Sequence, residues 1–340
     1  MQKQTNKPVI IWLLSGCLLI FLMVVIGGIT RLTNSGLSMV DWKLIMGAIP
    51  PLNEEAWLLV FEQYKQFPEY QKVNTHFTLN EFKSIFFWEY LHRLIGRLIG
   101  LVFIIPFVYF IVKKKLSKKL IQQCLILLSM GALQGFIGWW MVKSGLVNNP
   151  DVSHYRLAVH LITAFLTFAY TFWVALSLLY PKADGTHQHL RTIAGVVFAL
   201  TLLQIIYGAF VAGLNGGLVM NTWPKMGANW VDDSVTAMQP LWVNFVEGIG
   251  GVQFVHRYLA YLVVASILFL WYKAKRVPLK SLQKLGVNLL LIAVLIQFTL
   301  GVFTLIYAVP VWMGVAHQLG AFFLLTSIVL VMSSFRKASQ

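Results

Sequence analysis

The stretch IFFWEYLHRLIGRLIGLVFIIPFVYFIV, residues 85–112, is long and apolar enough to decide the class of fold. A transmembrane helix needs about 20 apolar residues, and this run exceeds that length. The whole chain of 340 residues is 58% hydrophobic and only 11% charged. Eight such runs are predicted to span a membrane: 9–29, 85–112, 120–142, 155–179, 192–214, 252–271, 285–308 and 313–333. None of them alternates like the strands of a transmembrane barrel, so the sequence predicts an all-α integral membrane protein.

The net charge of +15 follows the predicted topology. Eight spans place both termini on one side of the membrane, and the loops on that side are rich in lysine, as at 113–119 and 273–284. Because lysine and arginine accumulate in cytoplasmic loops, we expect both termini in the cytoplasm and no nucleic-acid partner. The first apolar run lacks a processing site, so we expect it to remain as a helix in a bacterial plasma (inner) membrane.

An internal repeat divides the chain. Residues 27–42 line up with residues 208–223 at constant spacing, which matches Gly27 with Gly208 and Trp42 with Trp223. We therefore expect two pseudo-symmetric four-helix bundles, related by an axis along the membrane normal because each half starts and ends on the same side. The predicted halves are residues 1–180, with a long outer loop at 31–84, and residues 181–340, with an outer loop at 215–251.

Four histidines share one predicted depth. His92, His160, His256 and His317 each lie a few residues into an even-numbered span, about two turns below the outer interface. Ionisable groups inside a membrane are costly and mark functional sites. Two facing imidazoles suit the axial positions of a haem iron, whereas zinc prefers more ligands at close spacing. The alternative is that each histidine only hydrogen-bonds to a neighbouring helix.

Charged residues beside these histidines differ between the halves. Arg93 and Arg257 each follow a histidine and could bind haem propionates, or could extend toward lipid headgroups. Glu89 precedes His92 by three residues, and its counterpart in the repeat is Gln253. A carboxylate beside one haem could relay protons, which predicts that the first half is the reaction site. Glu89 could instead be an ion-pair partner of Arg93.

Several motifs resemble those of the haem A synthase family. They are GGITRLTNSGLSMVDW at 27–42, WEYLHRLIGR at 88–97, the helix of His160, FVHR at 254–257 and AHQLG at 316–320. The similarity covers nearly the whole chain. It implies two four-helix bundles in which the C8 methyl group of haem O is oxidised to a formyl group, yielding haem A. Some members carry cysteine pairs in the outer loops, and this chain does not.

The resemblance also implies roles for the positions that match the family's motifs. By similarity, His256 and His317 are axial ligands of a resident haem b, and His92 and His160 are axial ligands of the substrate haem. Glu89 is the acidic residue of the family and is expected to be catalytic together with this second pair. The expected partners are haem O, a haem O synthase, an electron donor, membrane lipid and a further copy of the chain.

Two other functions are compatible with paired histidines. A dihaem b-type cytochrome would only transfer electrons, and the contrast between Glu89 and Gln253 argues against it. A haem transporter would fit an internal repeat. Transporters usually place their sites near the membrane midplane on broken helices, whereas these histidines lie near one interface.

Overall fold

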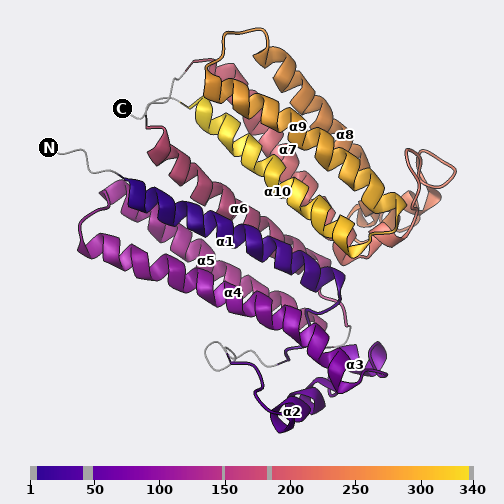
Figure 1. The fold of residues 1–340 in the computed structure, drawn as a ribbon. Coiled ribbons are helices and arrows are strands. Elements are labelled where there is room, and N and C mark those ends of the chain that lie inside the picture. Colours follow the sequence, from indigo (N-terminus) through magenta and orange to yellow (C-terminus); the bar gives the residue numbers. More distant parts are fainter. Residues whose placement is uncertain (1–5, 41–48, 148–149, 182–185, 337–340) are drawn as a thin grey trace. The chain divides into compact units, whose positions relative to one another are not determined.

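The computed structural model describes residues 6–40, 49–147, 150–181 and 186–336. In this part of the chain every regular element is a helix, and eight helices are long and apolar enough to cross a membrane (Figure 1). These eight are α1 (Lys7–Leu32), α4 (Leu79–Val112), α5 (Lys118–Gly145), α6 (His154–Leu179), α7 (Gln188–Gly213), α8 (Ile249–Ala274), α9 (Ser281–Ile306) and α10 (Val311–Ser334). The predicted all-α membrane fold with eight spans is confirmed.

Contacts group the described chain into two units. The N-terminal unit runs from Leu18 to His160, and the C-terminal unit comprises the residues up to Cys17 and those from Leu161 onward. The boundaries therefore fall within α1 and α6. The predicted halves, 1–180 and 181–340, stay a prediction. Residues 182–185 between them lie outside the described part of the chain, as does Trp42 of the predicted repeat.

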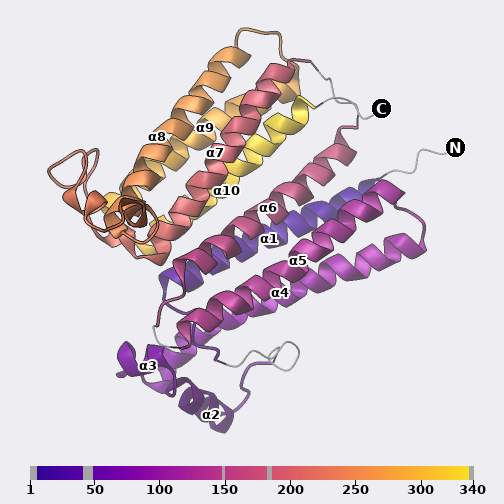
Figure 2. The ribbon, with the colours of Figure 1, turned by 180° about the vertical axis from the view of Figure 1, so that it is seen from behind.

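The C-terminal unit contains a four-helix bundle in which α7 and α9 each contact both α8 and α10 (Figure 2). Buried apolar side chains fill the end of this bundle that is remote from His256 and His317. They are Leu190, Ala194, Val197, Val263, Ile267, Leu270, Ala274, Val287, Leu290, Val294, Leu324, Ile328, Val331 and Phe335. Residues 254–257 and 314–321, around the two histidines, are only half-buried. The apolar core thus closes one end of the bundle and leaves the histidine level less tightly filled.

The N-terminal unit carries a small helical cap on α4. This helix begins at Leu79, well before the predicted residue 85, because Thr78 and Glu81 form a capping box: the Thr78 amide donates to the Glu81 carboxylate at 2.7 Å. Helices α2 (Glu54–Tyr64) and α3 (Pro68–Lys72) lie in the long outer loop. The buried contact of α2 with α4 is mainly aromatic, and Met39 from the start of the loop packs with it: the other members are Phe61, Tyr64, Phe82, Ile85 and Phe86.

The second long outer loop is built from short 3-10 helices. They are η2 (Gly216–Leu218), η3 (Asp233–Thr236) and η4 (Leu241–Phe245). Both η3 and η4 contact α8, which carries His256. In each unit, therefore, structured loop residues pack on the helix that follows the loop and bears a candidate histidine.

Candidate functional site

Each of the four histidines packs against a glycine of the preceding long helix. A Cβ atom added at any of these glycines would lie only 2.8–3.2 Å from the imidazole Cε1. The pairs are Gly27 on α1 with His92 on α4 (3.0 Å), Gly138 on α5 with His160 on α6 (3.2 Å), Gly208 on α7 with His256 on α8 (3.2 Å) and Gly301 on α9 with His317 on α10 (2.8 Å). Only glycine lets the ring lie this close to the neighbouring backbone.

The close approach orients the imidazole rings. At Gly27 and Gly208, the atoms within 4 Å of the added Cβ are Cε1 and Nδ1 of the histidine, and Nε2 is farther away. The Nδ1 edge of His92 therefore faces α1, and its Nε2 is turned away from that helix; in His256, Nδ1 is also the nearer nitrogen, although Nε2 lies 3.5 Å from the Gln204 amide on α7. An imidazole that binds a metal through Nε2 carries its proton on Nδ1, so this orientation suits metal ligation.

Glutamines one turn before three of the glycines contact the same histidines. The Gln134 amide nitrogen lies 3.2 Å from His160 Nδ1, and that of Gln204 lies 3.2 Å from His256 Nδ1. Each also donates to the backbone carbonyl of its histidine, at 2.9 and 3.0 Å. The Gln297 amide lies 3.5 Å from Nε2 of His317. These contacts hold each ring in place on the preceding helix, with an amide N–H facing the imidazole.

The sequence reasoning missed the roles of these glutamines and glycines. The repeated signal Gln-x-x-x-Gly, at 134–138, 204–208 and 297–301, is visible in the sequence. This motif contacts a histidine only because the helix face that bears the glutamine and the glycine is turned toward the histidine of the next helix.

The two histidines of each predicted pair belong to the same unit. Within the N-terminal unit, the imidazoles of His92 and His160 are close enough to interact electrostatically. Within the C-terminal unit, those of His256 and His317 do the same. The described residues contain no cluster of three or more histidine, cysteine or carboxylate side chains that could hold a metal ion. Each unit therefore holds two histidines within electrostatic range of each other.

Glu89 is buried and fully engaged. Its carboxylate accepts hydrogen bonds from Arg93 at 2.6 Å, from the Ser38 hydroxyl at 2.7 Å and from the Met39 amide at 2.8 Å. Arg93 also donates to the Met39 carbonyl at 2.7 Å. The ion pair between Glu89 and Arg93, one of the two expectations for this carboxylate, is thus present, and it fastens residues 35–39 to α4. Binding of a haem propionate by Arg93 stays a prediction.

In the C-terminal unit, Gln253 and Arg257 occupy the positions equivalent to Glu89 and Arg93. They also bind the preceding loop, but Gln253 acts as a hydrogen-bond donor where Glu89 is an acceptor. The Gln253 amide donates to the carbonyls of Gly216 and Val219 at 2.7 and 2.8 Å. Arg257 donates to three further carbonyls between residues 220 and 225, at 2.6–3.1 Å. A carboxylate faces loop donors in one unit, and an amide faces loop acceptors in the other. The exchange of Glu89 for Gln253 therefore has a structural reason besides any chemical one.

A second buried carboxylate lies in the outer cap. Glu69 on α3 is 5% exposed and accepts a hydrogen bond from the Tyr64 hydroxyl at 3.0 Å. Asn74 in turn donates to Tyr64 at 2.9 Å. Burial raises the pKa of Glu69 to about 8, opposed by the hydrogen bond from Tyr64. No feature of the sequence distinguished this glutamate from the exposed acids of the same loop.

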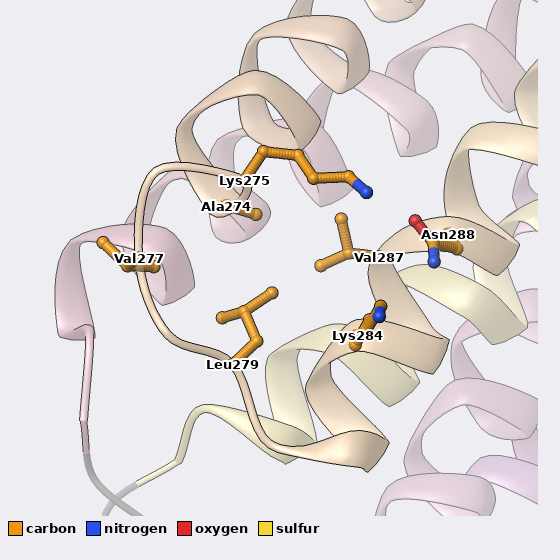
Figure 3. A pocket seen from close by; sticks show the side chains of 7 residues that line it. All are labelled: Ala274, Lys275, Val277, Leu279, Lys284, Val287 and Asn288. Atoms are coloured by element: carbon orange, nitrogen blue, oxygen red, sulfur yellow. The ribbon is translucent and has the colours of Figure 1, made fainter.

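A pocket elsewhere in the C-terminal unit has no connection with the histidines. Figure 3 shows it between the end of α8 and the start of α9, where Lys275, Lys284 and Asn288 are its polar lining residues. His256 precedes Ala274, another lining residue, by 18 positions on α8. At 1.5 Å per residue this is about 27 Å along the helix.

Comparison with known proteins agrees with the motifs. The model of the COX15-CtaA family, described as cytochrome oxidase assembly protein, matches residues 10–329. The chain is 57% identical over 338 residues to the heme A synthase of Flavobacterium psychrophilum, covering 98% of this chain and 100% of the relative. The chain belongs to the haem A synthase family.

Other haem A synthases match over nearly their full length. The heme A synthase of Flavobacterium johnsoniae is 56% identical over 340 residues, covering 98% of this chain and 100% of the relative. That of Nitrosospira multiformis is 44% identical over 336 residues, covering 98% and 94%. The resemblance drawn from the motifs is confirmed, and the matched region contains all four histidines of the two units.

Proposed function

We propose that the protein converts haem O into haem A by oxidising the C8 methyl group of the porphyrin to a formyl group. Its membership of the haem A synthase family makes it an oxidoreductase of haem A biosynthesis. The finer proposal rests on the pair of neighbouring histidines in each unit, each of whose rings packs against a glycine. Two haem sites allow one to hold the substrate and the other a resident cofactor.

His256 and His317 fit a resident haem b. A six-coordinate haem takes two axial ligands, and neutral imidazoles are common ones. Nε of Arg257 is buried without a hydrogen-bond partner among the described residues. Buried polar atoms normally have partners, so this atom supports a ligand at this level of the bundle. When bound, haem b would supply one-electron transfer, and Arg257 would donate to a propionate.

In the N-terminal unit, His92 and His160 would hold the substrate haem O. The Glu89–Arg93 pair holds residues 35–39 against α4. Glu89 precedes His92 by three residues on this helix. This attachment would keep bulk water away from the reacting edge of the substrate. Glu89 would also place a fixed negative charge beside the site, where it could hold or accept a proton during oxidation.

The proposed setting is the plasma membrane, with both termini in the cytoplasm. Eight apolar helices and the lysine-rich loops on one side support this orientation. The reaction needs an electron donor and a source of haem O, for which a haem O synthase in the same membrane is the natural supplier. The proposal also includes association of the protein with a second copy of itself.

Pigment analysis tests the function. The chain is expressed in a bacterium that makes haem O but has no haem A synthase, and the extracted haems are separated by chromatography. We expect haem A with the wild-type chain and with His76→Ala, which changes an exposed histidine of the outer loop. His92→Ala should abolish haem A. A wild-type protein that binds haem and never yields haem A would refute the proposal and restore the electron-transfer cytochrome.

A further inference from the structure

The pocket at the junction of α8 and α9 lies at the level of the lipid headgroups. Helix α8 has 26 residues, which is about 39 Å of helix, whereas the hydrocarbon core of a bilayer is about 30 Å thick. Lys275 caps the C-terminal end of α8, and Lys284 is the fourth residue of α9. Both side chains line the pocket, together with Asn288 one turn farther along α9 (Figure 3). The pocket therefore opens where the two helices leave the apolar layer.

The polar side chains of this pocket are all hydrogen-bond donors. Lys275 and Lys284 contribute ammonium groups, which have no acceptor atom. Oδ1 of Asn288 accepts a hydrogen bond from the Trp271 indole at 3.2 Å. Because an indole N–H can only donate, the oxygen of Asn288 must face Trp271, and its NH2 group is left as a donor. Side chains that only donate suit an anion and offer nothing to a cation.

One of the two ammonium groups is also held in place. Nζ of Lys275 lies 5.2 Å from the centre of the Trp271 ring, within the range of a cation–π contact. Trp271 therefore positions both Lys275 and Asn288, one through its ring face and the other through its N–H group. Two of the three donors are thus set in place by a single aromatic side chain before any ligand binds.

No carboxylate in the described part of the C-terminal unit balances these cations. The unit's described acids are Asp232, Asp233 and Glu247, all in the outer loop at the opposite end of α8, and Asp184 lies outside the described residues. Lys284 also lies at a helix N-terminus, where the helix dipole favours an anion. Five basic residues and no acid occupy positions 273–284: Lys273, Lys275, Arg276, Lys280 and Lys284. A bound anion would neutralise this charge.

Apolar side chains complete the pocket and continue into the membrane. Val277 and Leu279 lie on the other side of the pocket from the ammonium groups (Figure 3). Farther into the apolar layer, α8 and α9 expose Phe269 and Leu289. The pocket measures about 270 Å³, slightly less than the roughly 300–1,000 Å³ of sites that enclose a drug-sized ligand. It can therefore take a headgroup, while longer apolar chains would stay on the helix surfaces.

We propose that this pocket binds the phosphate headgroup of an anionic glycerophospholipid, whose acyl chains lie along α8 and α9. Basic pockets between membrane-spanning helices on the cytoplasmic side bind anionic lipid headgroups in other proteins. Phosphatidylglycerol fits the donors because its headgroup has a phosphate and no ammonium group, whereas phosphatidylcholine would bring a cation toward the two lysines. Ala274 of the pocket lies about 27 Å along α8 from His256, so the lipid site does not depend on the proposed haem chemistry.

Native mass spectrometry of the purified full-length protein tests the proposal, with phosphatidylglycerol or phosphatidylcholine added to the detergent solution. The wild type should bind phosphatidylglycerol more tightly. Lys275→Gln/Lys284→Gln should lower that affinity by about 30-fold. The matched control is Lys113→Gln/Lys118→Gln, which removes two exposed lysines from the corresponding ends of α4 and α5 and should bind phosphatidylglycerol as the wild type does. Equal losses in both double variants would mean diffuse attraction to surface charge and would overturn the proposal.

A single substitution tests the donor set independently of the lysines. Asn288→Asp keeps an acceptor for Trp271 but replaces the NH2 donor with a negative charge, so it should abolish the preference for phosphatidylglycerol. Unchanged elution in size-exclusion chromatography would show that the variants fold. The proposal is overturned if Asn288→Asp retains the preference, or if the wild type binds both lipids equally. Displacement of phosphatidylglycerol by excess inorganic phosphate would assign the pocket to a soluble anion and overturn it as well. None of these outcomes bears on haem A formation.

Discussion

Replacing Glu89 by glutamine should release the loop segment 35–39 from α4. The carboxylate now accepts three hydrogen bonds, from Arg93, the Ser38 hydroxyl and the Met39 amide. A glutamine of the same size has one carbonyl oxygen and one NH2 group. Its NH2 group must therefore face one of these donors, and the positive charge of Arg93 loses its partner.

The size of the effect follows from burial. Side chains of Glu89 and Arg93 are only 4% and 9% exposed, so little solvent screens their interaction. Removing one partner of a buried ion pair costs about 3–5 kcal/mol. Since each 1.4 kcal/mol is about a factor of ten in an equilibrium constant, opening of the segment should become roughly 100- to 4,000-fold more frequent.

Hydrogen exchange measured by mass spectrometry reports this opening directly. Peptides that contain the Met39 amide should exchange about 100- to 4,000-fold faster in Glu89→Gln than in the wild type, if exchange proceeds by local opening. The matched control is Glu62→Gln, because Glu62 and Lys65 also lie 2.6 Å apart but are 60% and 30% exposed. Such a pair is worth at most about 1 kcal/mol. Equal protection of Met39 in Glu89→Gln and wild type would refute the reasoning.

Two other predictions concern the histidine seats and the outer cap. Gly301→Ala puts a Cβ 2.8 Å from Cε1 of His317 and should reduce the b-type haem absorbance by about tenfold or more. The control is Gly195→Ala, whose added Cβ has no neighbour within 4 Å and should leave that absorbance unchanged. In the outer cap, burial raises the pKa of Glu69 to about 8, so its carboxyl stays protonated in the folded cap over a pH range where it ionises in the unfolded chain. Protection of α2 and α3 from hydrogen exchange should therefore fall as the pH rises toward 8, and Glu69→Gln should remove this pH dependence. A cap that is equally protected at every pH would contradict this second prediction.

Sequence-based reasoning predicted the eight spans and the common depth of the histidines because both depend on local properties. The length and apolarity of a run decide whether it can span a membrane. A histidine's distance from the end of its span gives its depth. The early start of α4 could also have been predicted, since Thr78 and Glu81 have the spacing of a capping box.

Only the tertiary structure decided what surrounds each functional side chain. Glu89 looked like a proton relay or an ion-pair partner from spacing alone, and its contacts with Ser38 and Met39 join residues about fifty positions apart. Likewise, the motif Gln-x-x-x-Gly acquires a meaning only when α7 packs against α8 and sets Gly208 on His256. Periodicity determines which face of a helix is apolar, but the rotation and depth at which two helices meet depend on how all their side chains pack together.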